Sequence, residues 1–324
     1  MIYDCFTFFN ELEITELRLN ILCDYVDKFV IVEGNKTHTG AEKDFIFEKN
    51  MERFSKFLDK IIYIKVDDFP PLNDSQEDSY GNKWLYENYQ RDAIMKGLKE
   101  CRSDDIVIIS DCDEIPNPKA IKKYKSGICT FLQWTFYYKL NMLNSKNPYS
   151  KGAKICRYSD LLDPKQDIGN LEYAQFSKYG LPTYLRFCKG KKLRNGGWHF
   201  SYFGDVNAII KKRQSIVEQQ FNTEENISPE KIKEAIEKGE DILGRGFKFV
   251  NINPNDILPM YVIKNMYKYL DFINQTNTIS LKKWVLGFIF SKIFSINYDN
   301  KNSVVYKIFG IKIKIKKRIN NCFQ

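Results

Sequence analysis

The first third of the chain alternates short apolar runs with helix-like segments, and this order restricts the possible folds more than any other feature. Strands are predicted at Ile2–Phe9, Phe29–Val32, Ile61–Val66 and Ile106–Ile109, and helices at Asn10–Tyr25 and Trp84–Cys101. Continuously apolar strands are typical of parallel sheets that are covered on both faces. Strands separated by helices predict βαβ units. We therefore expect an α/β fold with a single Rossmann-like, mostly parallel sheet flanked by helices.

The later part of the chain has a different texture. Thr130–Leu140 is an aromatic-rich strand region, and Val206–Phe221 and Pro229–Glu240 are predicted amphipathic helices with many surface charges. No clean linker or internal repeat is evident. We expect a catalytic domain over residues 1–280 and a C-terminal segment over residues 281–324.

The basic residues are concentrated at the C-terminus. The chain holds 50 Lys and Arg against 41 Asp and Glu, a formal charge of +9. Residues 281–324 contain ten basic residues and one acid, so the first 280 residues carry 40 of each sign. A nucleic-acid-binding protein normally has a basic body. The charge pattern therefore predicts no nucleic-acid partner.

The compartment is predicted from what the sequence lacks. Met1–Asp4 has no basic start of a signal peptide, and no stretch reaches the ~18 uninterrupted apolar residues of a spanning helix. The eight cysteines form no CxxC pair, which disfavours zinc clusters and a disulfide framework. We expect reduced thiols and a cytoplasmic protein.

The strongest local signal is a pair of aspartates after the fourth predicted strand. Asp111 and Asp113 follow Ile106–Ile109, and ligands of open α/β sheets gather at the carboxyl ends of strands. Two carboxylates at this spacing can reach one Mg²⁺ or Mn²⁺ ion, whose other positions substrate phosphates usually fill. His199 is a candidate third ligand. The alternatives are a solvated acidic turn and a packed histidine whose polar atoms are satisfied by backbone groups.

Other polar residues suggest contacts to a nucleotide. Glu33 ends the second strand and precedes a polar loop, so it could accept a hydrogen bond from a ribose or base. Lys43 and Arg91 are candidate partners of a diphosphate. A turn or N-cap role for Glu33 and surface salt bridges for the two cations are equally open. The pair Gly196-Gly197 permits close approach of a ligand or forms a turn, and His38 fits a structural loop residue better than a metal ligand.

An ordered set of motifs resembles glycosyltransferase family 17. It comprises Tyr3-Asp4-x-Phe6-x-Phe8-Phe9-Asn10-Glu11-Leu12, Phe29-Val30-Ile31-Val32-Glu33 with Thr37-His38, Gln90-Arg91-Asp92, Ser110-Asp111-x-Asp113-Glu114-Ile115-Pro116 and Gly197-Trp198-His199-Phe200-Ser201. The resemblance covers roughly residues 2 to 215, and the ordered set is far more specific than any one motif.

This resemblance implies a GT-A type fold, a UDP-sugar donor and inversion at the anomeric carbon. It makes Asp113 a metal ligand, Asp111 a residue shared between metal and ribose, and His199 the late histidine of the metal site. The implied cofactors are Mn²⁺ or Mg²⁺ and UDP-N-acetylglucosamine. The implied donor-binding residues are Asn10, Glu11, Glu33, Thr37, His38, Lys43, Arg91, Asp111, Gly197 and Trp198.

The acceptor is expected to be a glycan or a lipid-linked saccharide in surface polysaccharide or lipo-oligosaccharide synthesis. The animal members of the family carry an N-terminal membrane anchor, and this sequence shows none, so their glycoprotein acceptor is not carried over. The resemblance implies a direct displacement in which a carboxylate takes the proton of the acceptor hydroxyl. Candidate bases are Asp160, Asp163, Asp167, Glu172 and Asp205. We favour Glu172, 27 residues before His199 (199 − 172).

The C-terminal segment suggests contact with a membrane. Val304–Arg318 alternates apolar and basic residues, and Trp284–Phe294 is apolar with flanking lysines. Basic residues near an anionic lipid surface contribute about 1 kcal/mol each, so this segment could hold the protein peripherally at the inner face of the cell membrane. The alternative is a charged edge strand that folds back on the body.

Two other functions compete with a transferase. A nucleotidyltransferase also uses paired carboxylates, but it usually has a glycine-rich phosphate loop, and Phe6–Glu11 contains no glycine. A non-enzymatic membrane adaptor would carry the same basic tail and have only solvated turns in place of the site. The sequence has no P-loop, GxGxxG or GxSxG motif.

Overall fold

The computed structural model describes residues 1–71, 84–163, 180–215, 222–224, 226–275, 277–300, 303–308 and 311–316. The first elements are β1 (Ile2–Phe8), α1 (Leu12–Leu22), β2 (Lys28–Gly34), α2 (Ile46–Lys49), the 3-10 helix η1 (Met51–Lys60), β3 (Ile61–Val66), α3 (Leu85–Asp92), α4 (Ile94–Gly97), β4 (Ile106–Asp111), β5 (Glu114–Pro116) and α5 (Pro118–Ile121).

The elements that follow are β6 (Cys129–Tyr137), β7 (Met142–Asn144), β8 (Tyr149–Ser150), β9 (Lys154–Arg157), α6 (Tyr158–Leu162), α8 (Leu181–Phe187), β10 (Lys191–Ser201), α9 (Val206–Ser215), α10 (Pro229–Lys238), β11 (Phe249–Asn251), α11 (Pro254–Ile257), α12 (Met260–Lys264), η3 (Met266–Lys268) and η4 (Leu270–Phe272). The tail forms α13 (Leu281–Ile293), β12 (Phe294–Asn300), β13 (Ser303–Ile308) and β14 (Ile311–Lys316).

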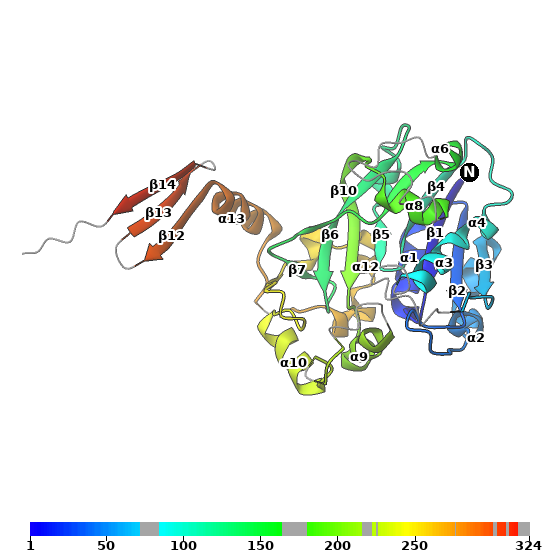
Figure 1. Cartoon of the computed structure of the whole chain (residues 1–324), viewed down its shortest axis with the longest axis horizontal. Helices are drawn as coiled ribbons and strands as arrows, with labels where there is room; N and C mark the ends of the chain where they lie inside the picture. Colours follow the sequence, from blue (N-terminus) through cyan, green and yellow to red (C-terminus); the bar gives the residue numbers. More distant parts are fainter. Residues whose placement is uncertain are drawn as a thin grey trace, which may run out of the picture.

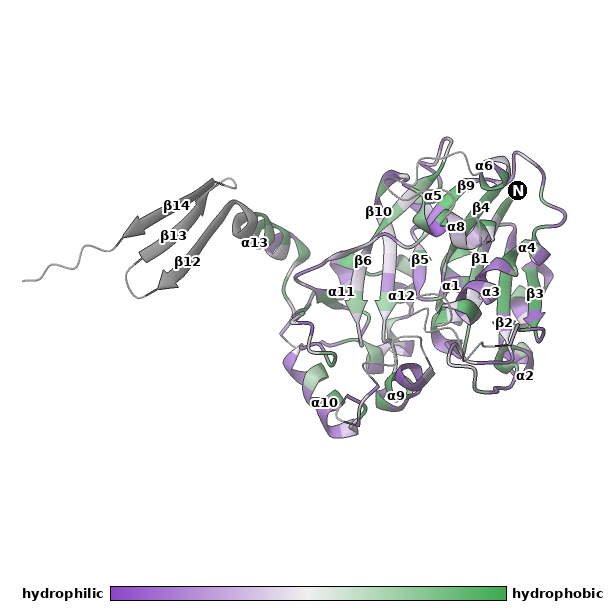
Figure 2. Cartoon of the chain, in the orientation of Figure 1, coloured by the Kyte–Doolittle hydropathy of each residue, from purple (hydrophilic) through white to green (hydrophobic). Residues whose placement is uncertain are grey.

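A large sheet crosses the body in the order β11-β7-β6-β9-β4-β1-β2-β3 (Figure 1). The strands β3, β2, β1 and β4 are parallel to one another. Along β2, Phe29 and Ile31 pack into the cluster that contains α1 and η1, whereas Val30 and Val32 pack into the cluster that contains α4 and α8. Figure 2 shows the hydrophobic colouring along these central strands. The predicted α/β class is confirmed.

The second half of the sheet is mixed, whereas the sequence predicts a mostly parallel sheet. Strand β9 runs antiparallel to β4 and to β6, and β10 runs parallel to β6 and antiparallel to β5. The helix predicted at Trp84–Cys101 is divided into α3 and α4. A Cβ atom at Gly97 would lie 2.5 Å from Val30 Cγ1, so the glycine lets the end of α4 sit directly on β2.

The topology brings the candidate residues to one edge of the sheet. Thr7 near the end of β1 pairs in register with Asp111 at the end of β4. The antiparallel pairing of β10 with β5 sets His199 opposite Glu114. Three segments that are far apart in the sequence therefore meet at the carboxyl ends of the parallel strands.

The tail begins on the body and ends in a separate small sheet. Trp284 of α13 is 9% exposed and lies edge-on to Trp134 of β6, with ring centroids 6.2 Å apart. Strands β12, β13 and β14 pair only with each other among the described residues, apart from the main sheet (Figure 1). Within this part of the chain, no helix has the length and apolar character needed to cross a membrane.

Candidate active site

A cavity of about 330 Å³ lies at the carboxyl ends of β1 and β4. Its charged lining includes Glu11, Glu87, Arg91, Asp111, Asp113, Arg186, Lys212 and Arg245, and both histidines, His38 and His199, border it. These residues come from both halves of the chain. The predicted aspartates and the late histidine therefore share one cavity.

A second cavity of about 210 Å³ adjoins the first. The two share Glu11, Asp113 and Lys212 as lining residues. The smaller cavity is also bordered by the rings of Phe203 and Phe272, whose centroids are 4.7 Å apart. Two neighbouring compartments with a charged boundary suit a reaction between two substrates.

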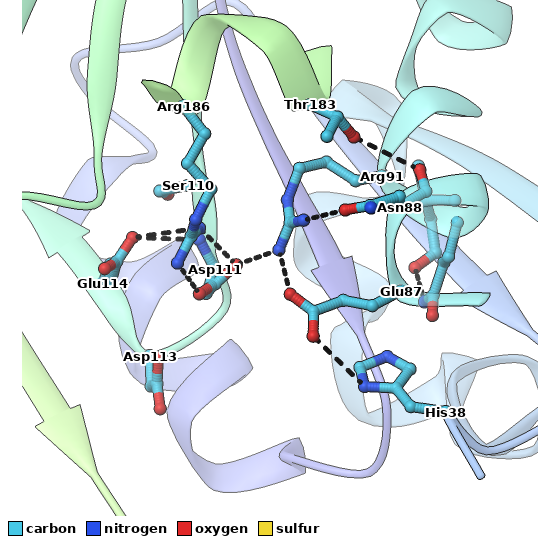
Figure 3. Close-up of polar contacts among 12 residues, drawn as sticks. His38, Glu87, Asn88, Arg91, Ser110, Asp111, Asp113, Glu114, Thr183 and Arg186 are labelled. Atoms are coloured by element: carbon cyan, nitrogen blue, oxygen red, sulfur yellow. Dashed lines mark hydrogen bonds and ion pairs between the residues drawn. The ribbon is translucent and has the colours of Figure 1, made fainter. Parts of the chain in front are cut away.

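Asp111 is held by two arginines. Arg186 Nη1 and Nη2 donate to Asp111 Oδ1 and Oδ2 at 2.8 and 2.7 Å, and Arg91 Nη2 donates to Oδ1 at 3.0 Å (Figure 3). Burial alone would raise the pKa of Asp111, but the charges and hydrogen bonds of Arg186 and Arg91 outweigh it and hold that pKa well below 3.8. Asp111 is therefore an ionised carboxylate whose two oxygens are both in use.

Asp113 points away from this group (Figure 3) and belongs to a second one. Lys212 Nζ donates to Asp113 Oδ2 at 2.9 Å, and His199 Nε2 lies 3.7 Å from Asp113 Oδ1. Burial opposes ionisation, but the charges of Lys212 and His199 lower the pKa of Asp113. Within the described residues, Nδ1 of His199 is buried without a hydrogen-bond partner.

The predicted three-ligand metal site does not form from these side chains. Asp113 and His199 lie together, but Asp111 is turned toward the arginines. Among the residues that the structure describes, no three His, Cys, Asp or Glu side chains are grouped so that they could hold a metal ion. The residues present do not fit the metal centre that the sequence predicts, because Arg186 and Lys212 already neutralise its carboxylates.

A buried network below the cavity fixes the Asp111–Glu114 segment. Arg18 of α1 donates to the carbonyl oxygens of Asp111, Cys112 and Glu114 at 2.9, 3.2 and 3.1 Å. Glu114 is 2% exposed, and its burial raises its pKa against the nearby charge of Arg186. The backbone at this edge is therefore tied to α1.

Glu33 and Lys43 do not take the predicted ligand roles. The buried Glu33 carboxylate accepts from the backbone of Ile46 and Phe47, from Tyr63 Oη and from Lys43 Nζ. Lys43 Nζ donates in addition to two carbonyl oxygens. Neither residue lines the cavity. The hydrogen bonds of Glu33 and Lys43 are thus made within the protein and fix the start of α2. This corrects the expectation that the two residues contact a nucleoside and a diphosphate.

Thr37 and His38, in the polar loop after β2, have different roles. Thr37 Oγ1 bonds to Thr39 Oγ1 and accepts from the backbone of Ala41, which closes a turn. Thr37 is absent from the cavity lining, whereas His38 borders the cavity and lies 3.7 Å from Glu87. His38 is therefore the residue of this loop that a ligand can reach.

The prediction that Gly197 and Trp198 bind the donor is also corrected, because both residues serve packing between elements of the fold. A Cβ atom at Gly197, where φ is +130°, would lie 2.1 Å from the carbonyl oxygen of Ile115, so the glycine permits β10 to approach β5. Trp198 Nε1 donates to Ile257 O at 2.6 Å. Successive strand residues face opposite ways, and Trp198 lines a groove of about 1190 Å³ that His199 does not border.

The candidate bases lie in different places. Glu172 and Asp167 are outside the described residues. Asp160 accepts from the backbone of Arg157, and Asp205 accepts from the backbone of Ala208 and lines the smaller cavity. Asp163 lies at the end of α6 and borders neither of the two cavities. Asn10 and Glu11 border the cavities as the motif implies.

Four charged residues of the larger cavity are missing from the prediction: Glu87, Arg186, Lys212 and Arg245. Glu87 and Lys212 lie on helices that carry other charged residues, which is typical of a solvated helix face, whereas Arg186 is the single charged residue of the short helix α8. No sequence signal separates Lys212 from its neighbour Lys211. The buried Arg18 does have a signal, since it falls on the apolar stripe of α1 with Ile14 and Leu22.

Comparison with known proteins identifies the relationship. A family model described as glycosyltransferase family 17 matches residues 1–144. The rat β-1,4-mannosyl-glycoprotein 4-β-N-acetylglucosaminyltransferase is 23% identical over 292 residues, which cover 81% of this chain and 52% of the rat protein. The human enzyme of the same name is 23% identical over 289 residues, covering 80% and 52%. The chain thus spans about half the length of these relatives.

A solved structure overlaps weakly. A sucrose complex assigned as a glucose-1-phosphate thymidylyltransferase of Bacillus anthracis covers 61% of this chain and 88% of its own, at 12% identity and a TM-score of 0.33. The family model and the two enzymes confirm the resemblance, and the first 144 residues of this chain are similar to glycosyltransferase family 17.

Proposed function

We propose that this chain is a glycosyltransferase that moves N-acetylglucosamine from UDP-N-acetylglucosamine to a hydroxyl group of a glycan or lipid-linked saccharide. One observation carries the proposal. Phe8–Glu11, His38, Gln90–Arg91 and Asp111–Asp113 all fall inside the family match, and residues of each segment line the same cavity. The relatives' name supports N-acetylglucosamine as the transferred sugar.

The two cavities suggest where the substrates bind. The larger one, with its four basic side chains, suits a nucleotide diphosphate. The smaller one offers the faces of Phe203 and Phe272 together with the polar groups of Asn10 and Asp205, and sugars combine apolar faces with hydroxyl groups. Attack of an acceptor hydroxyl across the shared boundary would break the bond from the donor sugar to UDP and invert the anomeric carbon.

A direct assay tests this proposal. The full-length protein is incubated with UDP-N-acetylglucosamine and other UDP-sugars, with Mn²⁺, Mg²⁺ or EDTA, and release of UDP is measured. We expect turnover of UDP-N-acetylglucosamine above that of the other donors, and loss of most of it in Asp113→Asn. Absence of both UDP-sugar turnover and UDP binding under every condition would contradict the proposal.

Glu172 remains our prediction for the catalytic base. Glu172→Gln keeps the shape of the side chain but cannot accept a proton, and positioned bases contribute roughly 10²- to 10⁴-fold to rates. We expect transfer to fall by about that factor while the affinity for UDP stays unchanged. Asp205→Asn is the matched control, because Asp205 caps α9 and lines the acceptor-side cavity. Near-normal turnover of Glu172→Gln would assign the base elsewhere.

We also propose that residues 281–324 hold the protein peripherally on anionic lipid at the cytoplasmic face of the membrane. Ten basic residues against one acid support this. Because Trp284 packs on Trp134, removing the whole segment would disturb the body. The full-length chain with Lys312, Lys314 and Lys316 changed to Gln is therefore the better test.

Sedimentation with vesicles of phosphatidylserine and phosphatidylcholine measures the membrane binding. We expect the triple Gln variant to lose most of it. A control variant with Gln at Lys99, Lys123 and Lys125, which are exposed on the body, should bind as the wild type does. Equal binding by both variants would exclude the tail as the lipid contact.

A further inference from the structure

The carboxylates expected to bind a metal ion already have cationic partners. Arg186 and Arg91 neutralise Asp111, and Lys212 neutralises Asp113 at 2.9 Å. Divalent ions are held by carboxylates whose charge is available to them. A metal ion bound by both oxygens of Asp113 would have to displace Lys212 from Oδ2, and it would then lie beside the displaced ammonium group.

Most acids of the larger cavity are paired with cations of the same cavity. Its described lining contains four acids, Glu11, Glu87, Asp111 and Asp113, and four bases, Arg91, Arg186, Lys212 and Arg245. Three of these acids form ion pairs within the cavity: Glu87 with Arg91, and the two aspartates as above. Arg245 pairs with Asp241 outside the cavity, and Glu11 accepts from the backbone of Phe9 and Asn10. The two aspartates expected to hold the ion are thus already paired with cations of the cavity.

Lys212 occupies the boundary between the two cavities. It lines both of them, and its side chain is 23% exposed. A lysine ammonium group has three N–H donors, and the hydrogen bond to Asp113 uses one. The remaining donors stand where the bond between the donor sugar and its diphosphate would lie, if the sugar is passed from the larger cavity to an acceptor in the smaller one.

We infer that Lys212, oriented by Asp113, hydrogen-bonds the diphosphate of the donor and neutralises the charge of the departing UDP in the place of a metal ion. This inference rests on the proposed function. The bond from the anomeric carbon to the diphosphate oxygen breaks, and UDP leaves with the electron pair. The acceptor oxygen forms the new bond, its proton passes to the base, and Lys212 stays protonated throughout. Lysine and arginine serve this purpose at transferring phosphates as metal ions do.

Calorimetry with UDP separates the two sources of positive charge. The full-length protein is titrated with UDP in EDTA and then in Mn²⁺. The same titrations are made on Lys212→Met, Lys212→Arg and the control Lys211→Met, which removes an exposed charge from the next position of α9. Thermal melting of each variant verifies that it is folded.

We expect the wild type to bind UDP in EDTA within about threefold of its affinity in Mn²⁺. Lys212→Met should weaken binding by about 10- to 100-fold, the range of a charge-assisted hydrogen bond to phosphate. Lys212→Arg should retain most of the affinity, and Lys211→Met should match the wild type.

The opposite results are equally clear. Binding of UDP that requires Mn²⁺, together with an unchanged affinity in Lys212→Met, would overturn this inference and restore the metal ion while leaving the transferase proposal intact. Failure to bind UDP under either condition would instead remove the proposed function. If Lys212→Met does not fold, a requirement of the wild type for Mn²⁺ would still overturn the inference.

Discussion

Two arginine–aspartate pairs of the same chemistry have opposite surroundings. Their aspartates, Asp4 and Asp111, lie on the neighbouring strands β1 and β4. Arg18 grips Asp4 through two hydrogen bonds of 2.7 and 2.6 Å, and neither side chain is exposed. Arg186 grips Asp111 through bonds of 2.8 and 2.7 Å, but these side chains are 28% and 31% exposed. The two pairs are bonded in the same way, but solvent reaches only the second pair.

The remaining contacts of each arginine explain what this difference does. Arg18 also donates to Ser110 Oγ and to three carbonyl oxygens of the Asp111–Glu114 segment, so its bonds serve the backbone and no ligand reaches them. Arg186 and Asp111 both border the cavity. The two pairs have the same chemistry and differ in burial. The buried pair stabilises the fold, whereas the partly exposed pair is accessible to a substrate.

The largest effect is expected from Arg18→Met. It leaves Asp4 buried without its partner, and breaking such a pair costs roughly 3–5 kcal/mol. Urea denaturation should therefore show a fall of about this size in the free energy of unfolding. Arg53→Met is the matched control, because Arg53 pairs with Glu13 and Glu16 while 34% exposed. Its cost should stay below ~1 kcal/mol. Similar losses in both variants would cancel the distinction.

A smaller effect, and on a different quantity, is expected from Arg186→Gln. The change removes a cation from the cavity and leaves Asp111 with Arg91. We expect UDP affinity to fall about tenfold, with a loss of stability well below that of Arg18→Met. Calorimetry and urea denaturation of the same preparation measure both. An unfolded variant, or one with normal UDP affinity, would show that this pair belongs with the buried one.

The smallest effect is a change in the acid sensitivity of the fold. The folded pKa values of Asp111 and Asp113 lie below their ordinary value, so their contribution to stability is present above pH ~4 and is lost as the pH falls. Glu114, with a raised pKa, contributes in the opposite sense as the pH rises. We expect wild-type unfolding free energy to decrease from pH 6 to pH 3, with a shallower slope in Arg186→Gln. Equal slopes would mean that Arg186 does not set the pKa of Asp111.

The strands of the parallel half of the sheet could be predicted from the sequence. Continuous apolar runs such as Phe29–Val32 are buried on both faces, and each predicted strand there is found. The placement of Asp111 and Asp113 also follows from the pattern. Polar residues at the end of a buried parallel strand lie at the edge of the sheet where the carboxyl ends of the strands meet.

The partners of these acids could not be read from the sequence. Arg186 and Lys212 come from helices 75 and 99 positions along the chain from the residues that they contact, and local periodicity carries no information about such contacts. Glu33 misled the prediction for a related reason. It ends a strand at the right edge, beside Phe8, but the start of α2 and Tyr63 take both of its oxygens.

The contact between Trp284 and Trp134 has a practical use. Indole fluorescence responds to the polarity around the ring, and these two rings lie where the appended helix meets the body. Any event that lifts this helix from the strand beneath it would alter the emission without an added dye. If the emission shifts on adding vesicles, and shifts less in Trp284→Phe, the intrinsic fluorescence reports the separation of α13 from the body.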